Sequence, residues 1–317
     1  MALLQKSKGN ATMDKKNDVP SGLAFGLGAT LLWGSYPLWY KPLSQLNAYH
    51  LLSWRIVFAE ACLLALIVLT GRFGAVKTTL QTIRFRHVLT VAVVLSLWWL
   101  LYIYGIMSGR VLEVAFGYFL SPIMSMVVSR LIFKERLSSL QLAAFSLAVA
   151  GVLLMAFELL NLHSFPWIAI IIGFCYSFYG VFKKKVPGDP VVVQSVEIAI
   201  MLPFAACFLF VAGARGEGHI FLLSTNTDLL LLATGLITVL PLWWYSRAAK
   251  QLPMMTLSFL QFVPPTCNFF LAALVYHETI SPLKTGAFLC IWTALAVFTW
   301  DSVNKQKQPL LLMAVKP

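Results

Sequence analysis

Long apolar runs alternate with short polar segments along almost the whole chain. A run of about twenty apolar residues is long enough to cross a hydrocarbon core roughly 30 Å thick. On that criterion the pattern predicts ten transmembrane helices, at residues 22–41, 49–70, 88–107, 113–133, 139–157, 167–183, 191–213, 228–247, 254–276 and 282–300. The connections are short and leave no room for a soluble domain. We therefore expect an all-α membrane protein whose function lies within the helix bundle.

Composition and charge agree with this expectation. Of the 317 residues, 59% are hydrophobic and 11% are charged, whereas soluble domains contain about 25% charged residues. Of the 24 Lys and Arg residues, 19 fall on the side of the membrane that holds both termini, four fall on the other side, and Arg55 lies inside a helix. Cytoplasmic loops are enriched in these residues, so both termini are predicted to be cytoplasmic. The net charge of +12 then reflects loops, and no nucleic-acid partner is expected.

The two halves of the chain resemble each other at a fixed offset of 143 residues. The offset aligns Pro122 with Pro265 and Glu135 with Glu278, and it also pairs other polar and aromatic positions, among them Tyr36 with Tyr179, Lys41 with Lys184 and Tyr102 with Tyr245. We expect a cytoplasmic tail at 1–21, five-helix repeats at 22–157 and 165–300, and a second tail at 301–317. Five is odd, so the second repeat is inverted, a construction typical of alternating-access carriers.

The paired prolines lie near the middle of two of the predicted helices, 113–133 and 254–276. Proline removes a backbone hydrogen bond and kinks a helix, so we expect bends at Pro122 and Pro265. A static kink that improves packing and a hinge are both compatible with the pattern.

Charged residues inside membrane helices are candidates for function, because each costs about 2.5 to 3.5 kcal/mol at a helix centre. Glu60 and Glu197 are interpreted as contacts for a solute or as proton-coupling groups, against the alternative of a buried structural hydrogen bond. Glu113 opens a predicted helix, where its carboxylate is favoured by the helix dipole. Glu135 and Glu278, each at a helix end, are interpreted as caps of the following turn.

Aromatic residues recur at helical spacing, with Trp33, Tyr36 and Tyr40 in the first predicted helix and Tyr176 and Tyr179 in the matching helix of the second repeat. Trp98, Tyr102 and Tyr245 follow the same pattern in another matched pair of helices. Such stripes toward the bundle centre suit a flat aromatic or a cationic solute, through stacking and cation–π contacts of about 0.5 to 2 kcal/mol each. Interfacial belts and helix packing are the alternative.

No enzyme site emerges from the sequence. There is no GxxxxGK[ST] segment and no HExxH, and the five histidines lack the spacing of metal ligands. The five cysteines lie within apolar runs and form no CxxC pair, which predicts reduced thiols. We therefore expect a non-enzymatic protein without cofactor or metal.

Several short motifs together resemble those of the RarD group of the EamA-type drug/metabolite transporters. They comprise Trp33-Gly34, Trp54-Arg55, Leu112-Glu113, Gly117-Tyr118-Phe119 with Pro122, Phe133-Lys134-Glu135-Arg136, Phe178-Tyr179-Gly180, 235–241, and 259–265 ending in Tyr276-His277-Glu278. The resemblance implies ten helices in two inverted repeats, a central cavity and export of drugs or metabolites. On matching positions it implies that Arg55, Glu113, Tyr118, Tyr179 and Gln261 line the cavity. One departure is Trp54, where close relatives carry His, so a proton role for that His does not transfer.

The favoured interpretation is a secondary carrier in a bacterial inner membrane, exporting amino-acid-like metabolites or amphiphilic drugs, with protons as the candidate coupling ion. The expected partners are a small-molecule substrate and bilayer lipid, and the protein is a monomer or a homodimer. One alternative is an uptake or exchange carrier for a larger solute such as a nucleoside-like compound. Another is a membrane scaffold, receptor or lipid-handling protein.

Overall fold

The computed structural model describes residues 20–43, 46–108, 110–135, 137–160, 165–216, 225–275, 277 and 281–314. The chain opens with a helix at residues 20–34. There follow α2 (Tyr36–Tyr40), the short η1 (Lys41–Leu43), α3 (Ala48–Leu69), α4 (Phe73–Thr82), α5 (Phe85–Met107), α6 (Val111–Phe133), α7 (Ser139–Leu160), α8 (Trp167–Lys185), α9 (Pro190–Ala214), α10 (Thr225–Gln251), α11 (Met254–Leu260), α12 (Val263–Phe270), the π-helix η2 (Leu271–Val275) and α13 (Pro282–Ala314). The expectation of an all-α membrane protein is confirmed.

Within these residues, nine helical segments are long and apolar enough to cross a membrane. The tenth predicted span, 22–41, is instead divided at Ser35 between the helix at 20–34 and α2. Pro37 lies in the first turn of α2, and a proline lacks the N–H that a continuous helix would need there. Hydropathy marks this segment as apolar but does not detect the break.

A second break lies inside the predicted helix 254–276. The chain leaves α11 after Leu260, turns at Gln261 and Phe262, and restarts as α12. Pro264 and Pro265 occupy the first turn of α12, where missing N–H groups cost least. The bend expected at Pro265 therefore lies a few residues earlier, as an interruption of the helix. Pro122 is different, because it lies within α6, which runs unbroken from Val111 to Phe133.

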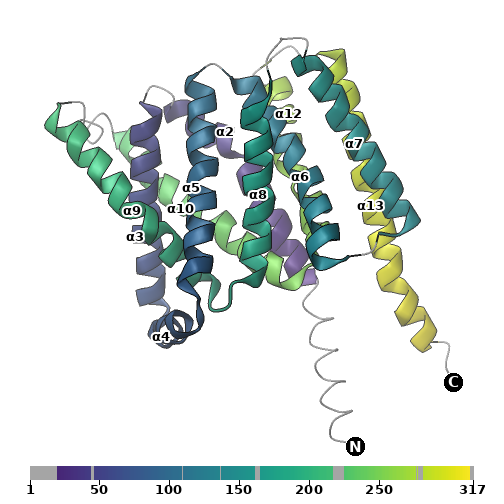
Figure 1. The fold of residues 1–317 in the computed structure, drawn as a ribbon, viewed down its shortest axis with the longest axis horizontal. Helices are drawn as coiled ribbons and strands as arrows, with labels where there is room; N and C mark the ends of the chain where they lie inside the picture. The colour runs from purple at the N-terminus through teal and green to yellow at the C-terminus, as the bar shows by residue number, and fades with distance from the viewer. Residues whose placement is uncertain are drawn as a thin grey trace, which may run out of the picture.

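Helix α4 was not predicted, because the sequence pattern suggested only a connection at 71–87. Figure 1 shows α4 lying across the lower end of the bundle, below α3. It is anchored there through Thr79, which is buried and whose hydroxyl accepts a hydrogen bond from the Asp189 backbone N–H at 3.0 Å. At ten residues, α4 is too short to register as a membrane span.

The bundle has two flanks joined through a central helix. Helix α7 pairs with α13 on one flank, and α3 pairs with α9 and α10 on the other, while α8 packs against both α5 and α6 in the middle (Figure 1). Close approach depends on small residues, since a Cβ on Gly117 of α6 would lie 3.0 Å from the Ala169 Cα of α8. The start of the described chain and the end of α13 lie at the same end of the bundle as α4 (Figure 1). Helix α13 also continues to Ala314, well into the segment expected as a polar tail.

Candidate functional site

A cavity of about 420 Å³ lies between the two broken helices and α3, α5, α6, α8 and α10. This volume is within the range of small-molecule sites. Its lining is dominated by aromatic side chains and consists of Trp33, Tyr36, Pro37, Tyr40, Leu43, Leu46, Leu51, Leu52, Arg55, Trp98, Trp99, Tyr102, Tyr118, Ser121, Tyr176, Leu242, Gln261, Pro264, Pro265 and Asn268. The leucines at 43, 46 and 51 carry the lining toward the end of the bundle opposite α4.

Most residues predicted for the cavity converge on it. Its lining includes the predicted set Trp33, Tyr36, Arg55, Trp98, Tyr102, Tyr118 and Gln261, together with the proline Pro265. Three others, Glu113, Tyr179 and Tyr245, are not part of the lining. The aromatic spacing and the family resemblance thus point to helices that border the cavity, but they do not separate residues that line it from those one layer behind.

The aromatic wall is held together by edge-to-face contacts. The ring centroids of Trp98 and Tyr176 lie 4.6 Å apart at an interplanar angle of 87°, and Tyr176 also meets Trp33 at 6.0 Å. Tyr118 contacts Trp98 at 6.2 Å and Tyr102 at 6.0 Å. Edge-to-face pairs of this kind stabilise the position of each ring beyond what burial alone provides. The wall is therefore a preorganised aromatic surface.

Arg55 supplies the positive charge of this site. Its Nε donates a hydrogen bond to Thr238 Oγ1 at 2.7 Å, which ties α3 to α10. Its Cζ lies 4.2 Å from the ring centroid of Trp99, and 5.6 Å and 5.8 Å from those of Tyr36 and Tyr40. No described carboxylate forms an ion pair with it, and none lines the cavity among the residues that the structure describes.

The break between α11 and α12 places Gln261 in the cavity wall. Its Nε2 donates to the Tyr245 hydroxyl at 3.1 Å, and its Oε1 accepts from Ser125 Oγ at 3.1 Å. Gln261 and Phe262 keep right-handed helical φ and ψ, and the Gln261 N–H still donates to the Leu257 carbonyl at 3.2 Å, so the interruption is a tight turn and not unwound backbone. The two broken helices also touch, because a Cβ on Gly34 would lie only 2.5 Å from Cys267 Cβ.

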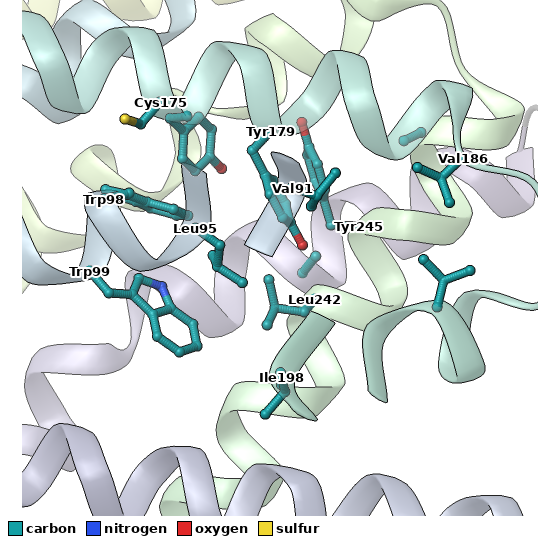
Figure 2. Close-up of a cluster of buried hydrophobic side chains, with 14 of the residues drawn as sticks. Val91, Leu95, Trp98, Trp99, Cys175, Tyr179, Val186, Ile198, Leu242 and Tyr245 are labelled. Carbon is teal, nitrogen blue, oxygen red and sulfur yellow. The ribbon is translucent and has the colours of Figure 1, made fainter. Parts of the chain in front are cut away.

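Beyond the cavity, toward α4, the bundle is closed by aromatic packing. Tyr179 and Tyr245 stack with their ring centroids 6.2 Å apart and an interplanar angle of 20° (Figure 2). Each is at most 1% exposed. Leu242, which lines the cavity, lies beside this pair (Figure 2). Tyr179 and Tyr245 therefore act as the layer that separates the cavity from the lower end of the bundle.

Glu135 joins three helices below this layer. Its carboxylate accepts hydrogen bonds from the backbone N–H groups of Met254 and Met255, both at 2.9 Å, at the N-terminus of α11. Lys184 Nζ of α8 lies 3.7 Å from Glu135 Oε1. Beside a local contact with Ser129 Oγ of α6 at 2.7 Å, Glu135 thus caps α11, 119 positions away, which the sequence interpretation as a cap of the short turn did not include. We call this arrangement the Glu135 clamp. The matching Glu278 lies outside the described residues.

The other buried carboxylates are held by partners away from the lining. Glu197 pairs with Lys183 at 2.7 Å, and both side chains are at most 2% exposed. Glu60 Oε1 accepts a hydrogen bond from Ser195 Oγ at 2.6 Å. Glu113 pairs with Arg110 at 2.6 Å and accepts from the Ile168 backbone N–H at 2.7 Å, so it caps α8. In the described part of the chain, no cluster of His, Cys, Asp and Glu is arranged to hold a metal.

Sequence reasoning missed several residues at the cavity, and two residues that position Arg55 are among those it did not name. Trp99 lines it together with Trp98, and Thr238 fixes the guanidinium of Arg55. Trp99 follows the predicted residue Trp98. A stripe that takes one side chain per helical turn leaves out the residue next to each chosen position. A wider stripe along α5 would have included it. Thr238 carried no signal, because its role depends on a contact across 183 residues.

Comparison with known proteins identifies the group to which the chain belongs. Residues 20–157 match the model of the EamA-like transporter family. Protein RarD of Streptomyces exfoliatus is 32% identical and the alignment covers 93% of each chain. Protein RarD of Escherichia coli K12 is 31% identical over 93% of this chain and 99% of that protein. An uncharacterized transporter of Bacillus subtilis, YojE, is 31% identical over 90% of this chain and 96% of its own length.

The fold also resembles a crystal structure with a TM-score of 0.69 at 17% identity, covering 88% of this chain and 97% of the other. The relatives are named as transporters, which points to a non-enzymatic role. With a multi-pass helical bundle around an aromatic cavity and relatives similar along nearly the whole chain, this bacterial membrane protein belongs to the RarD group of the EamA-type drug/metabolite transporters.

Proposed function

We propose that this transporter is a secondary carrier that moves small organic metabolites or drugs across the bacterial inner membrane by alternating access at the aromatic cavity. The observation that carries the proposal is the position of the cavity. Its lining extends toward one end of the bundle, while the Tyr179–Tyr245 layer and the Glu135 clamp close the other end. A site open to one face at a time is the basis of alternating access.

We further propose that the two halves are inverted repeats, which is the architecture typical of this mechanism. By order, the helix at 20–34 corresponds to α8, α3 to α9, α5 to α10, α6 to α11 and α12, and α7 to α13. The packing respects that correspondence, because α3 pairs with its counterpart α9, α7 with its counterpart α13, and the pair α3–α10 is matched by α9–α5. Within the described residues, the two non-glycine residues with positive φ are Lys134 at 53° and His277 at 52°. Their numbers differ by 143, which is the offset of the sequence repeat.

We propose that both termini face the cytoplasm, which the distribution of basic residues favours. In that orientation the Glu135 clamp is on the cytoplasmic side and the conformation described is closed toward the cytoplasm. Rocking of the two repeats would open the clamp and close the opposite end. Export is the direction we propose, following the resemblance to drug/metabolite exporters, and uptake or exchange of a larger solute is the alternative.

Glu60 is our candidate for proton coupling. The charge of Glu197 is already balanced by Lys183, whereas Glu60 has a single hydroxyl partner, Ser195, and forms no ion pair with a described residue. An intramembrane carboxylate without a cationic partner is typical of proton relays. Glu60 lies between α3 and α9 and outside the cavity lining. Its protonation would therefore be coupled to transport through movement of these helices and not through direct contact with the solute.

Transport is tested with purified protein in liposomes and a panel of radiolabelled amino acids, nucleosides and aromatic drugs, with and without a pH gradient. We expect counterflow of at least one aromatic compound, and Glu60→Gln is expected to retain counterflow but lose stimulation by the pH gradient. A second measurement is independent of the solute. In a cysteine-free background, Ser121→Cys in the cavity lining is expected to react with a membrane-impermeant maleimide from either face. Labelling from one face only, without transport of any compound, would contradict the carrier proposal.

A further inference from the structure

We propose that the cavity selects organic anions that carry an aromatic group, with an aromatic carboxylate as the simplest example, and that Arg55 holds the anionic group. This inference rests on the proposed carrier function and narrows its substrate class. It replaces the broader expectation of aromatic or cationic solutes that the aromatic stripes alone suggested.

The charge balance of the lining is the first observation. Among the described residues of the lining, Arg55 is the charged one, and the other polar members, including Gln261, Asn268 and Ser121, are neutral. No described carboxylate pairs with the guanidinium. An uncompensated positive charge in a cavity of low dielectric attracts an anion strongly and repels a cation. The solute is therefore proposed as the counter-ion, since the described residues provide none.

The geometry of Arg55 is the second observation. Thr238 occupies its Nε, and the Trp99 ring centroid lies 4.2 Å from its Cζ, with those of Tyr36 and Tyr40 at 5.6 Å and 5.8 Å. The hydrogen bond uses Nε, and the aromatic rings hold the guanidinium carbon in place. The two Nη groups make no hydrogen bond or ion pair with a described residue. An arginine that is fixed in this way presents donors in the planar arrangement that a carboxylate accepts.

The aromatic wall accounts for the other half of the solute. Trp33, Trp98 and Tyr176 form one edge-to-face cluster, and Tyr118 and Tyr102 extend it. Rings held at fixed angles offer faces and edges to a flat apolar group without further ordering. The wall would also attract an ammonium group through cation–π contacts, but Arg55 in the same cavity opposes it. An aromatic amino acid, which carries both charges, is therefore expected to bind less tightly than the corresponding carboxylate.

Four compounds that share a phenyl ring and differ in charge test this inference by calorimetry on the purified protein. They are 3-phenylpropionate (anion), 3-phenylpropanamide (neutral), phenylalanine (zwitterion) and 3-phenylpropylamine (cation). We expect the anion to bind on the order of 30-fold more tightly than the cation, with the neutral and zwitterionic compounds between them. In liposomes, counterflow of 2-phenylethanesulfonate, whose permanent charge prevents passive diffusion, is expected to follow the same dependence on Arg55.

Substitutions of Arg55 complete the test. Arg55→Met is expected to lower the affinity for 3-phenylpropionate on the order of 30-fold and to leave the neutral amide within about threefold, which also reports an intact cavity. Arg55→Lys keeps the charge and loses the planar fork, so an intermediate loss is expected. The matched control is Arg247→Met, because Arg247 packs on Phe25 at 4.8 Å outside the cavity lining.

Affinities that do not depend on the charge of the compound, or that favour the cation, would overturn the inference. So would an Arg55→Met protein that retains the affinity of the native protein for the anion. Those outcomes leave the carrier proposal standing if the panel compounds are transported and Ser121→Cys is labelled from both faces. Failure of transport together with labelling from one face would instead remove the carrier proposal, whatever the cavity binds.

Discussion

The Arg55 guanidinium lies against the ring of Trp99, with 4.2 Å between the Arg55 Cζ and the ring centroid. The two residues come from different helices, α3 and α5, and both line the cavity. An arginine has several rotatable bonds, so a fixed position costs side-chain entropy. The contact with Trp99 and the hydrogen bond to Thr238 offset that entropy in the protein without solute, so binding does not have to order the side chain. The cavity is thus preorganised around its charge.

Removal of the Trp99 ring is predicted to weaken anion binding. Trp99→Leu leaves Arg55 without its stacking partner, and the loss of a partly desolvated cation–π contact corresponds to about 1 to 2 kcal/mol. We expect an affinity for 3-phenylpropionate on the order of tenfold lower, with a smaller change for the neutral amide. Trp99→Phe should restore part of the affinity, since it keeps a ring. Calorimetry measures both, and Trp300→Leu, at a residue that is 68% exposed, is the control.

The Glu135 clamp is predicted to stabilise the conformation that is closed toward the cytoplasm. Glu135→Gln removes the negative charge that the Met254 and Met255 N–H groups and Lys184 share. Hydrogen bonds to charged groups contribute about 1.5 to 3 kcal/mol. If the clamp is absent from the opposite conformation, cytoplasmic labelling of Ser121→Cys should increase on the order of tenfold.

Asp301→Asn is the control for that experiment. Asp301 of α13 accepts a hydrogen bond from Ser138 Oγ at 2.8 Å, just before α7, and this contact joins two helices of the same flank. The substitution also neutralises a carboxylate, but its donor Ser138 lies outside α11. Unchanged labelling in Glu135→Gln, or an equal rise in both variants, would show that the clamp does not control access.

The buried pair Lys183–Glu197 is predicted to contribute to the stability of the fold, with the effects of substituting the two residues strongly coupled. Both side chains are at most 2% exposed, and their charged atoms lie 2.7 Å apart. Lys183→Met or Glu197→Gln alone leaves one buried charge without a partner, which costs about 3 to 5 kcal/mol. The double variant removes both charges and should recover most of that loss. Thermal unfolding in detergent, analysed as a double-mutant cycle, measures the coupling. Additive losses would exclude a stabilising pair.

Gly235 is predicted to be indispensable for the contact between α10 and α3. A Cβ at this position would lie 2.6 Å from the backbone carbonyl carbon and oxygen of Phe58, which cannot move aside as a flexible side chain does. Gly235→Ala should therefore destabilise the protein by about 1 to 3 kcal/mol. Gly74→Ala is the matched control, because nothing lies within 4 Å of its Cβ position on α4. It should be neutral or slightly stabilising. Equal thermal stabilities would contradict the close packing.

Membrane residence and most helix positions follow from the sequence. Transfer of a side chain into hydrocarbon is a nearly local and additive quantity, so a run of twenty apolar residues identifies a span wherever it packs. Helices such as α3, α6 and α9 agree closely with the predicted ranges for that reason. The two interruptions, at Ser35 and at Gln261, escaped because apolar residues continue through them. A proline lies near each interruption and indicates a distorted helix. The exact residue at which each helix is interrupted depends on the neighbouring helices.

The sequence by itself determined which residue types are available to the cavity: helical spacing pointed to Trp33 and Trp98, and the family resemblance pointed to Arg55. Only the tertiary structure decided which of them share one space. Tyr179 and Tyr245 carry the same pattern and lie one layer away, where they close the bundle. The proposed role of Arg55 depends on its hydrogen bond to Thr238, 183 residues distant, and on the absence of a described carboxylate beside it. Such relationships arise from packing between helices, which side-chain periodicity within one helix cannot contain.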